Sequence, residues 1–156
     1  MKNDNKGFSL IELIVVIAIM AILVGVMAPN VLKYVESSRE SADKQAADAV
    51  RTAVMTALVD PGIADGSYPG AVSGKNINAS PFTESTATDF SEIFADNLGK
   101  TPSTIGDSLR SKKFKGADVL VTISSTNEVS VLLKGTATVD SKKWQYDTST
   151  GEVKAQ

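Results

Sequence analysis

The sequence contains no cysteine and no histidine among its 156 residues. Without cysteine the chain forms no disulfide and has no thiol nucleophile. Without histidine it lacks the commonest metal ligand, the usual general base and the side chain that titrates near neutral pH. Aromatic residues make up only 6% of the chain, and the formal net charge is only −2. We therefore expect no enzyme, no catalytic residue, no cofactor, no metal site and no clear nucleic-acid site.

Charge is also nearly absent from the N-terminal part of the chain. From Leu13 to Leu32 no residue is ionisable, and through Ala28 almost every residue is Leu, Ile, Val, Ala or Met. Those twenty residues would rise about 30 Å in a helix, the thickness of a bilayer's hydrocarbon core. Glu12 lies at the edge of this run, and a charge in a bilayer costs roughly 2.5–3.5 kcal/mol at the centre. The apolar run predicts a membrane helix. The free-energy cost of a charge at its edge predicts that Glu12 has a function there.

Two interpretations of this apolar run are a retained anchor and a removable secretory signal. Lys2 and Lys6 precede the run, so the positive-inside rule predicts a cytoplasmic N-terminus. Residues 26–28 offer small or apolar side chains for signal cleavage, but Pro29 would follow the cut. The run also exceeds the usual apolar region of about 7–15 residues. Both features favour the retained anchor.

A short motif at the start of the chain indicates which kind of anchor this is. Residues 6–12 read KGFSLIE, and fourteen apolar or small residues follow them. This arrangement resembles the class III signal of type IV pilins and related pseudopilins. The resemblance implies that a prepilin peptidase cuts between Gly7 and Phe8 on the cytoplasmic side and methylates the new amino terminus of Phe8. Glu12 and Pro29 then become mature residues five and twenty-two, as in the family pattern.

Glu12 has two possible roles, and the residues leave both open. The resemblance implies that its carboxylate pairs with the Phe8 amine of a neighbouring subunit in the filament core. Pairing would remove the cost of two isolated charges and set the axial register. However, Ser9 and Glu12 are also spaced as a capping box, which satisfies free N–H groups at a helix start without any partner.

Gly25 and Pro29 weaken the same turn of the predicted helix. Pro29 has no N–H to donate to the carbonyl of Gly25, and glycine is itself a poor helix former. One expectation is a kink in a membrane helix. The resemblance implies instead a stretch that unwinds on assembly, so we predict a helix break at these two residues.

From residue 33 to residue 59 the helical signal continues in a soluble composition, and Asp60–Gly62 end it. Small and apolar residues recur on one face at helical spacing. They are Ala42, Ala46, Ala49/Val50, Ala53/Val54 and Ala57/Leu58. This face is expected to lie against a sheet.

The remaining residues predict a small head with a sheet. Residues 61–105 are rich in Gly, Ser, Thr, Asn and Asp, and they predict a connecting loop with a short helix from Asp89 to Leu98. Alternating apolar residues then predict three or four antiparallel strands, with Trp144 over one side. The strands are expected near 117–124, 129–133, 143–146 and 151–154. The order resembles a pilin, an α+β fold with a long N-terminal helix packed by its second half against the sheet.

We therefore expect four segments along the chain. They are a leader peptide (1–7), a hydrophobic transmembrane and assembly helix (8–32), an amphipathic continuation (33–59) and a globular head (60–156).

Three features of the head have less specific interpretations. The basic residues between 110 and 115 are interpreted as a solvated loop, because no aromatic residue but Phe114 lies among them. Asp140 and Asp147 match no compact calcium loop and are assigned to turns. Asn78–Ser80 fits a glycosylation sequon, but Pro81 follows it and so short a match occurs by chance.

The predicted function is that of a structural subunit of a type IV pilus or pilus-like filament. Its expected partners are copies of itself, minor pilins, the prepilin peptidase, the membrane and an inner-membrane assembly platform. Before assembly it would be a single-pass membrane protein with its head outside, and afterwards part of an extracellular filament. One alternative is a pseudopilin of a type II secretion or DNA-uptake (competence) system. The other is a single-pass membrane-anchored binding module that stays monomeric.

Overall fold

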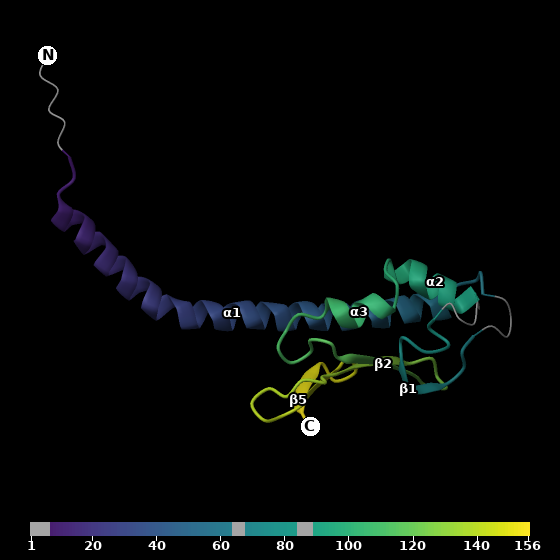
Figure 1. Cartoon of the computed structure of the whole chain (residues 1–156). Helices are drawn as coiled ribbons and strands as arrows, with labels where there is room; N and C mark the ends of the chain where they lie inside the picture. Colours follow the sequence, from purple (N-terminus) through teal and green to yellow (C-terminus); the bar gives the residue numbers. More distant parts are fainter. Residues whose placement is uncertain (1–6, 64–67, 84–88) are drawn as a thin grey trace, which may run out of the picture. The chain divides into compact units, whose positions relative to one another are not determined.

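The computed structural model describes residues 7–63, 68–83 and 89–156. By packing, the chain separates into two units, Met1–Glu36 and Ser37–Gln156. Figure 1 shows the elements in their order along the chain. One long helix begins in the first unit and ends in the second, and all the strands belong to the second.

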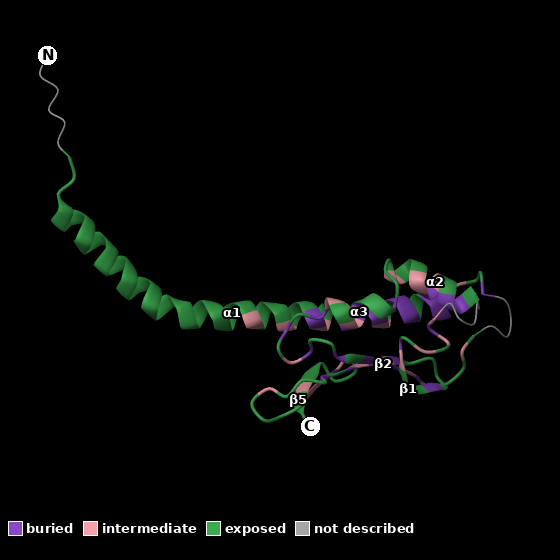
Figure 2. Ribbon diagram, in the orientation of Figure 1, coloured by how far each residue is buried: buried purple, intermediate pink, exposed green. Residues whose placement is uncertain are grey.

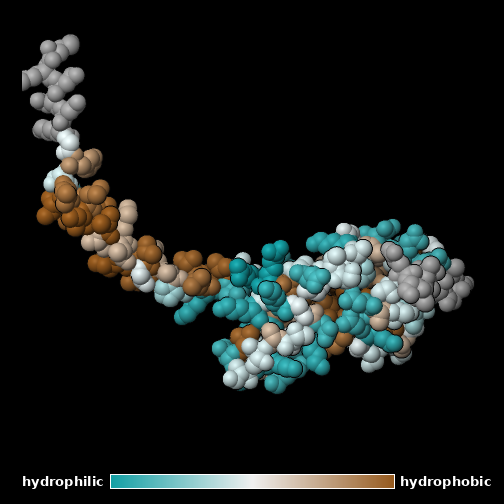
Figure 3. Space-filling model, in the orientation of Figure 1, coloured by the Kyte–Doolittle hydropathy of each residue, from teal (hydrophilic) through white to brown (hydrophobic). Residues whose placement is uncertain are grey.

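The long helix, α1 (Leu10–Leu58), has 49 residues. In the first unit it packs against nothing, and every described residue up to Val35 is exposed (Figure 2). The exposed side chains of this stretch are mainly Leu, Ile, Val and Met, which gives it a continuous apolar surface (Figure 3). By its length and composition, α1 is able to cross a membrane.

The second unit contains a five-stranded antiparallel sheet. Each strand pairs with the next one along the chain, so the order in the sheet is also the order in the sequence. The strands are β1 (Val72–Asn76), β2 (Asp118–Ile123), β3 (Val129–Lys134), β4 (Trp144–Asp147) and β5 (Glu152–Ala155). Such a meander requires only short hairpin connections between β2 and β5.

The core of the second unit lies between one face of this sheet and α1. Strands β2 and β3 bury every second residue, and opposite partners such as Val121 and Val131 are both inaccessible. Val50 and Val54 of α1 are fully buried in the same cluster. Burying a side chain of this size contributes about 1.5–3 kcal/mol, so each of these valines stabilises the unit.

Two short helices complete the second unit, α2 (Asp89–Leu98) and α3 (Ser103–Ser108). Phe90 and Phe94 point from α2 into the core, where their rings lie 6.1 and 5.6 Å from that of Phe82. The helix lies near the chain that follows α1, since a Cβ on Gly62 would be 3.8 Å from Cδ1 of Ile93. The aromatic cluster therefore holds α2 at the C-terminal end of α1 (Figure 1).

The predicted α+β fold is confirmed, including the helix from Asp89 to Leu98 and the four strands after residue 117. Two elements were not predicted, namely β1 and α3. Strand β1 has the sequence VSGKN, in which only Val72 is buried, so it shows no alternating pattern. Only its pairing with β2, a strand more than forty residues away, makes it a strand.

The predicted small-residue face of α1 is confirmed at Ala46, which packs against the core, and from Val50 to Leu58, but not at every position. Ala53 and Ala57 are buried as expected, but Ala42 and Ala49 are exposed. Asp43 is buried instead, only 3% exposed. Its carboxylate is held there by two backbone N–H groups from a distant loop, an interaction that apolar spacing does not reveal.

Candidate processing and assembly site

The peptide bond between Gly7 and Phe8 lies just before α1, outside any regular element. Phe8 is 93% exposed, and a Cβ on Gly7 would meet no atom within 4 Å. A peptidase must bind the backbone on both sides of the bond that it cuts, which a helical backbone does not allow. The predicted cleavage point is therefore in an open and accessible part of the chain.

Glu12 lies in the first turn of α1 and caps the N-terminal end of the helix. Its Oε2 accepts the backbone N–H of Ser9 at 2.8 Å, and Leu13 donates its N–H to the Ser9 carbonyl at 3.3 Å. Ser9 is thus the N-cap and Glu12 the third helical residue, which is the carboxylate half of a capping box. A negative charge here also interacts favourably with the helix dipole, by about 0.3–1 kcal/mol.

This geometry bears on both predicted roles of Glu12. The capping contact is present within one chain, as the spacing predicted. The N–H that the carboxylate accepts belongs to the residue directly after Phe8. The carboxylate therefore lies at Ser9, the second residue after the predicted cleavage point. The contact with the Phe8 amine of another subunit stays a prediction.

Helix α1 continues without interruption through Gly25 and Pro29. A Cβ on Gly25 would meet no atom within 4 Å. Neither residue is held by packing in this unit, so the turn keeps the two weaknesses described above. The predicted break on assembly stays a prediction.

The basic loop after α3 leaves Arg110, Lys112 and Lys115 exposed, as predicted, but it is also anchored to α1, which was not predicted. Asp43 accepts the backbone N–H groups of Arg110 and Ser111, each at 2.9 Å. Lys113 donates to Glu40 at 2.9 Å, and its Nζ lies 4.4 Å from the centre of the Trp144 ring. The loop is thus fastened to the helix at two points and to the sheet at a third.

The Glu40 carboxylate bridges Lys113 and Lys44, whose Nζ is 3.3 Å away. Desolvation by burial raises the pKa of Glu40, but the hydrogen bonds and charges of the two lysines outweigh it. The net result is a pKa below the ordinary value. Glu40 is therefore ionised wherever the head is folded near neutral pH.

Of the other interpreted features of the head, Asp147 has the contacts predicted for a turn residue. Asp147 accepts both the backbone N–H and the hydroxyl of Ser149, at 2.8 and 2.6 Å, as a turn residue does. Asn78 is exposed. Within residues 7–63, 68–83 and 89–156, no group of three or more His, Cys, Asp or Glu residues could hold a metal ion.

Comparison with known proteins adds three findings. Residues 2–28 match the family described as "Prokaryotic N-terminal methylation motif". The chain is 32% identical over 124 residues to "Prepilin peptidase-dependent protein A" of Clostridium perfringens, covering 78% of this chain and 87% of the relative. It is 32% identical over 117 residues to a "Type IV major fimbrial protein FimA" of Dichelobacter nodosus, covering 68% and 74%.

A second FimA of Dichelobacter nodosus is 36% identical over 80 residues, covering 51% of this chain and 50% of the relative. No solved structure matches the chain. The matched motif contains the exposed Gly7–Phe8 bond and the capping Glu12, and the two longest matches extend far beyond it into the head. The chain therefore belongs to the type IV pilins, a family of structural subunits rather than enzymes.

Proposed function

We propose that this chain is the structural subunit of a type IV pilus, made as a precursor that a prepilin peptidase cuts between Gly7 and Phe8. The observation that carries the proposal is the exposed Gly7–Phe8 bond directly before an uncovered apolar helix. The name of the Clostridium relative includes dependence on prepilin peptidase, which supports this processing step. Relatives named as fimbrial proteins favour a pilus subunit over a secretion or competence pseudopilin.

The precursor is anchored in the membrane by residues 8–32, with residues 1–7 as its leader. Lys2 and Lys6 keep the leader on the cytoplasmic side, so the head, residues 60–156, lies outside. Cleavage leaves the apolar helix in place. The subunit then moves from the membrane to a surface filament with the help of an assembly platform and minor pilins.

Glu12 has a different partner at each stage of this process. In the precursor it caps α1 through the N–H of Ser9. After cleavage a charged amine is present at Phe8, and in the filament core Glu12 pairs with the Phe8 amine of a neighbouring subunit. Two buried charges are tolerated only when each neutralises the other, so this pairing selects one axial register.

The first experiment is N-terminal sequencing and intact mass of the protein extracted from cells that make filaments. We expect a chain that begins with N-methylated Phe8. An intact Met1, or a chain that begins at Pro29, would rule out prepilin processing and with it the proposed function.

The second experiment separates assembly from capping by comparing Glu12→Gln with Ser9→Ala. Glu12→Gln retains an oxygen that accepts the N–H of Ser9 but removes the charge, so we expect normal cleavage and loss of filaments. Ser9→Ala is the matched control, because the observed contact uses the Ser9 backbone, and it should assemble normally. Filament yield after shearing measures both variants. Normal filaments from Glu12→Gln would disprove the charge pairing.

A further inference from the structure

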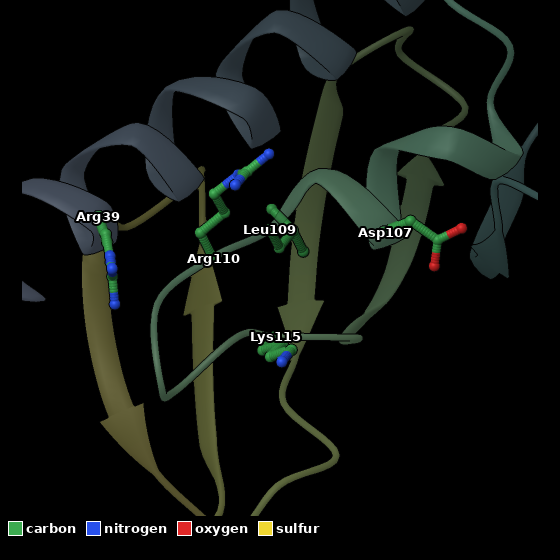
Figure 4. A pocket seen from close by; sticks show the side chains of 5 residues that line it. All are labelled: Arg39, Asp107, Leu109, Arg110 and Lys115. Atoms are coloured by element: carbon green, nitrogen blue, oxygen red, sulfur yellow. The ribbon is translucent and has the colours of Figure 1, made fainter.

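A basic pocket opens beside the anchored loop of the second unit. It has a volume of about 360 Å³ and is lined by Arg39, Asp107, Leu109, Arg110 and Lys115 (Figure 4). Arg39 comes from α1, Asp107 from α3, and the other three from the segment that follows α3. Asp107 points away from the three cationic side chains in this view. The pocket thus presents mainly positive charge.

Two of the cationic residues of this pocket, Arg110 and Lys115, follow α3 and have exposed side chains. Asp43 binds the backbone N–H of Arg110, which positions that residue but leaves its guanidinium unused. Among the residues that the structure describes, the side chains of Arg110 and Lys115 form no ion pair or hydrogen bond, and both are exposed. A rigid backbone with unpaired cations favours an anionic partner from outside the chain.

An acidic surface lies on α2. Asp89, Glu92 and Asp96 are exposed and, at helical spacing i, i+3 and i+7, share one face of the helix. These three carboxylates extend over about 10 Å, and α2 contains no Lys or Arg. The side chains of Glu92 and Asp96 have no partner within the described part of the chain.

The two surfaces come from different segments of the second unit, and they share no residue. The pocket begins at Arg39, whereas α2 lies beside Gly62, just past the end of α1 at Leu58. The nineteen helical residues between Arg39 and Leu58 rise about 28 Å. Two complementary patches at separate places on one chain form a heterologous contact between copies, which repeats into an open helical filament where the rotation does not close a ring.

We propose that the acidic face of α2 on one subunit docks in the basic pocket of the next subunit along the filament. This inference rests on the proposed function and adds the contact between heads to the contact between N-terminal helices. The occupant is a second copy of this chain, because the chain itself carries the complementary acidic surface. The contact selects a register between neighbouring heads, since a shift would place like charges together.

Charge reversal with rescue tests the contact in cells that express the full chain. Arg110→Glu alone and Glu92→Arg alone should each lower the yield of sheared filaments by about tenfold, the effect of roughly 1.4 kcal/mol at each contact. The two substitutions together should restore most of the yield. Lys134→Glu and Glu128→Arg are matched controls, because they reverse exposed charges outside both surfaces and should leave the yield unchanged.

Cysteine cross-linking gives a second measurement, since the chain has no cysteine of its own. A chain with both Lys115→Cys and Asp96→Cys should form a ladder of disulfide-linked oligomers when its filaments are oxidised. Each single cysteine variant should form no ladder. A double variant without a ladder, in filaments that form normally, would overturn the proposed contact.

The outcomes separate this inference from the proposed function. Parent cells without filaments, or without methyl-Phe8, would refute the function itself. If the parent chain forms filaments and both single variants also assemble normally, only the proposed contact between heads is refuted. If Arg110→Glu is defective, Glu92→Arg is normal and the pair is not rescued, the pocket binds another anion, such as a lipid headgroup or a polyanion, and the inference is wrong. Trp144 fluorescence of each variant should match the parent, which shows that the head is folded.

Discussion

Replacing Asp43 should destabilise the head more than any surface substitution on α1. Asp43 is 3% exposed, and its carboxylate accepts two backbone N–H groups at 2.9 Å, those of Arg110 and Ser111. A hydrogen bond to a charged group contributes about 1.5–3 kcal/mol. In Asp43→Ala the backbone N–H of the fully buried Ser111 loses its acceptor on α1, whereas the backbone N–H of the exposed Arg110 binds water instead.

We therefore expect Asp43→Ala to lower the free energy of unfolding by about 3–4 kcal/mol. For a domain with a total stability of about 5–15 kcal/mol, that is a large fraction. Asp43→Asn should lower it by about 2 kcal/mol, since the amide keeps one acceptor but faces the other N–H with a donor.

Urea unfolding of the full chain in detergent micelles measures these effects through Trp144, the only tryptophan. Its indole N–H donates to the Val139 carbonyl at 3.1 Å, so its emission reports whether the sheet is folded. Asp48→Ala, on the exposed side of the same helix, is the control and should stay within about 0.5 kcal/mol of the parent. An Asp43→Ala variant as stable as that control would refute the role of Asp43 in anchoring the loop.

Two further predictions concern the same region. Because the folded-state pKa of Glu40 is lowered, its contacts with Lys113 and Lys44 stabilise the head above about pH 4.5 and lose this effect as the pH falls through the lower folded pKa. Glu40→Gln should therefore have a free energy of unfolding about 0.5–1 kcal/mol below that of the parent at pH 7. In acid this difference should disappear, and an equal difference at both pH values would contradict the prediction. A Cβ on Gly135 would lie 2.9 Å from the Trp144 carbonyl oxygen and closer still to that of Lys113. Gly135→Ala should therefore cost about 1–3 kcal/mol of stability in the same urea assay, and an unchanged midpoint would show that the backbone moves aside freely.

The N-terminal part of the chain was predictable because its signals are local. The apolar run, the KGFSLIE motif and the spacing of Ser9 and Glu12 all lie within a few turns of one helix. The capping contact between Ser9 and Glu12 has the geometry that this spacing predicted. Helix α2 and strands β2 to β5 were also predictable, since each carries its own hydrophobic period.

The anchored loop could not be predicted, because its partners are far away in sequence. Asp43 and Ser111 are 68 positions apart, and Glu40 and Lys113 are 73 apart. Nothing in the composition around residue 43 indicates that a carboxylate there is buried, and nothing around residue 113 indicates a half-buried lysine. The loop therefore looked like an ordinary solvated segment.

By itself, the sequence determined the membrane-length helix, the cleavage motif, most of the secondary structure and the pilin family, because these depend on patterns between near neighbours. Only the tertiary structure decided that β1 is a strand, that Asp43 is buried, and that Arg110 and Lys115 remain exposed and unpaired beside it. The physical reason is that a backbone or side-chain polar group can be satisfied by any suitable partner, and only the folded chain determines which partner is near.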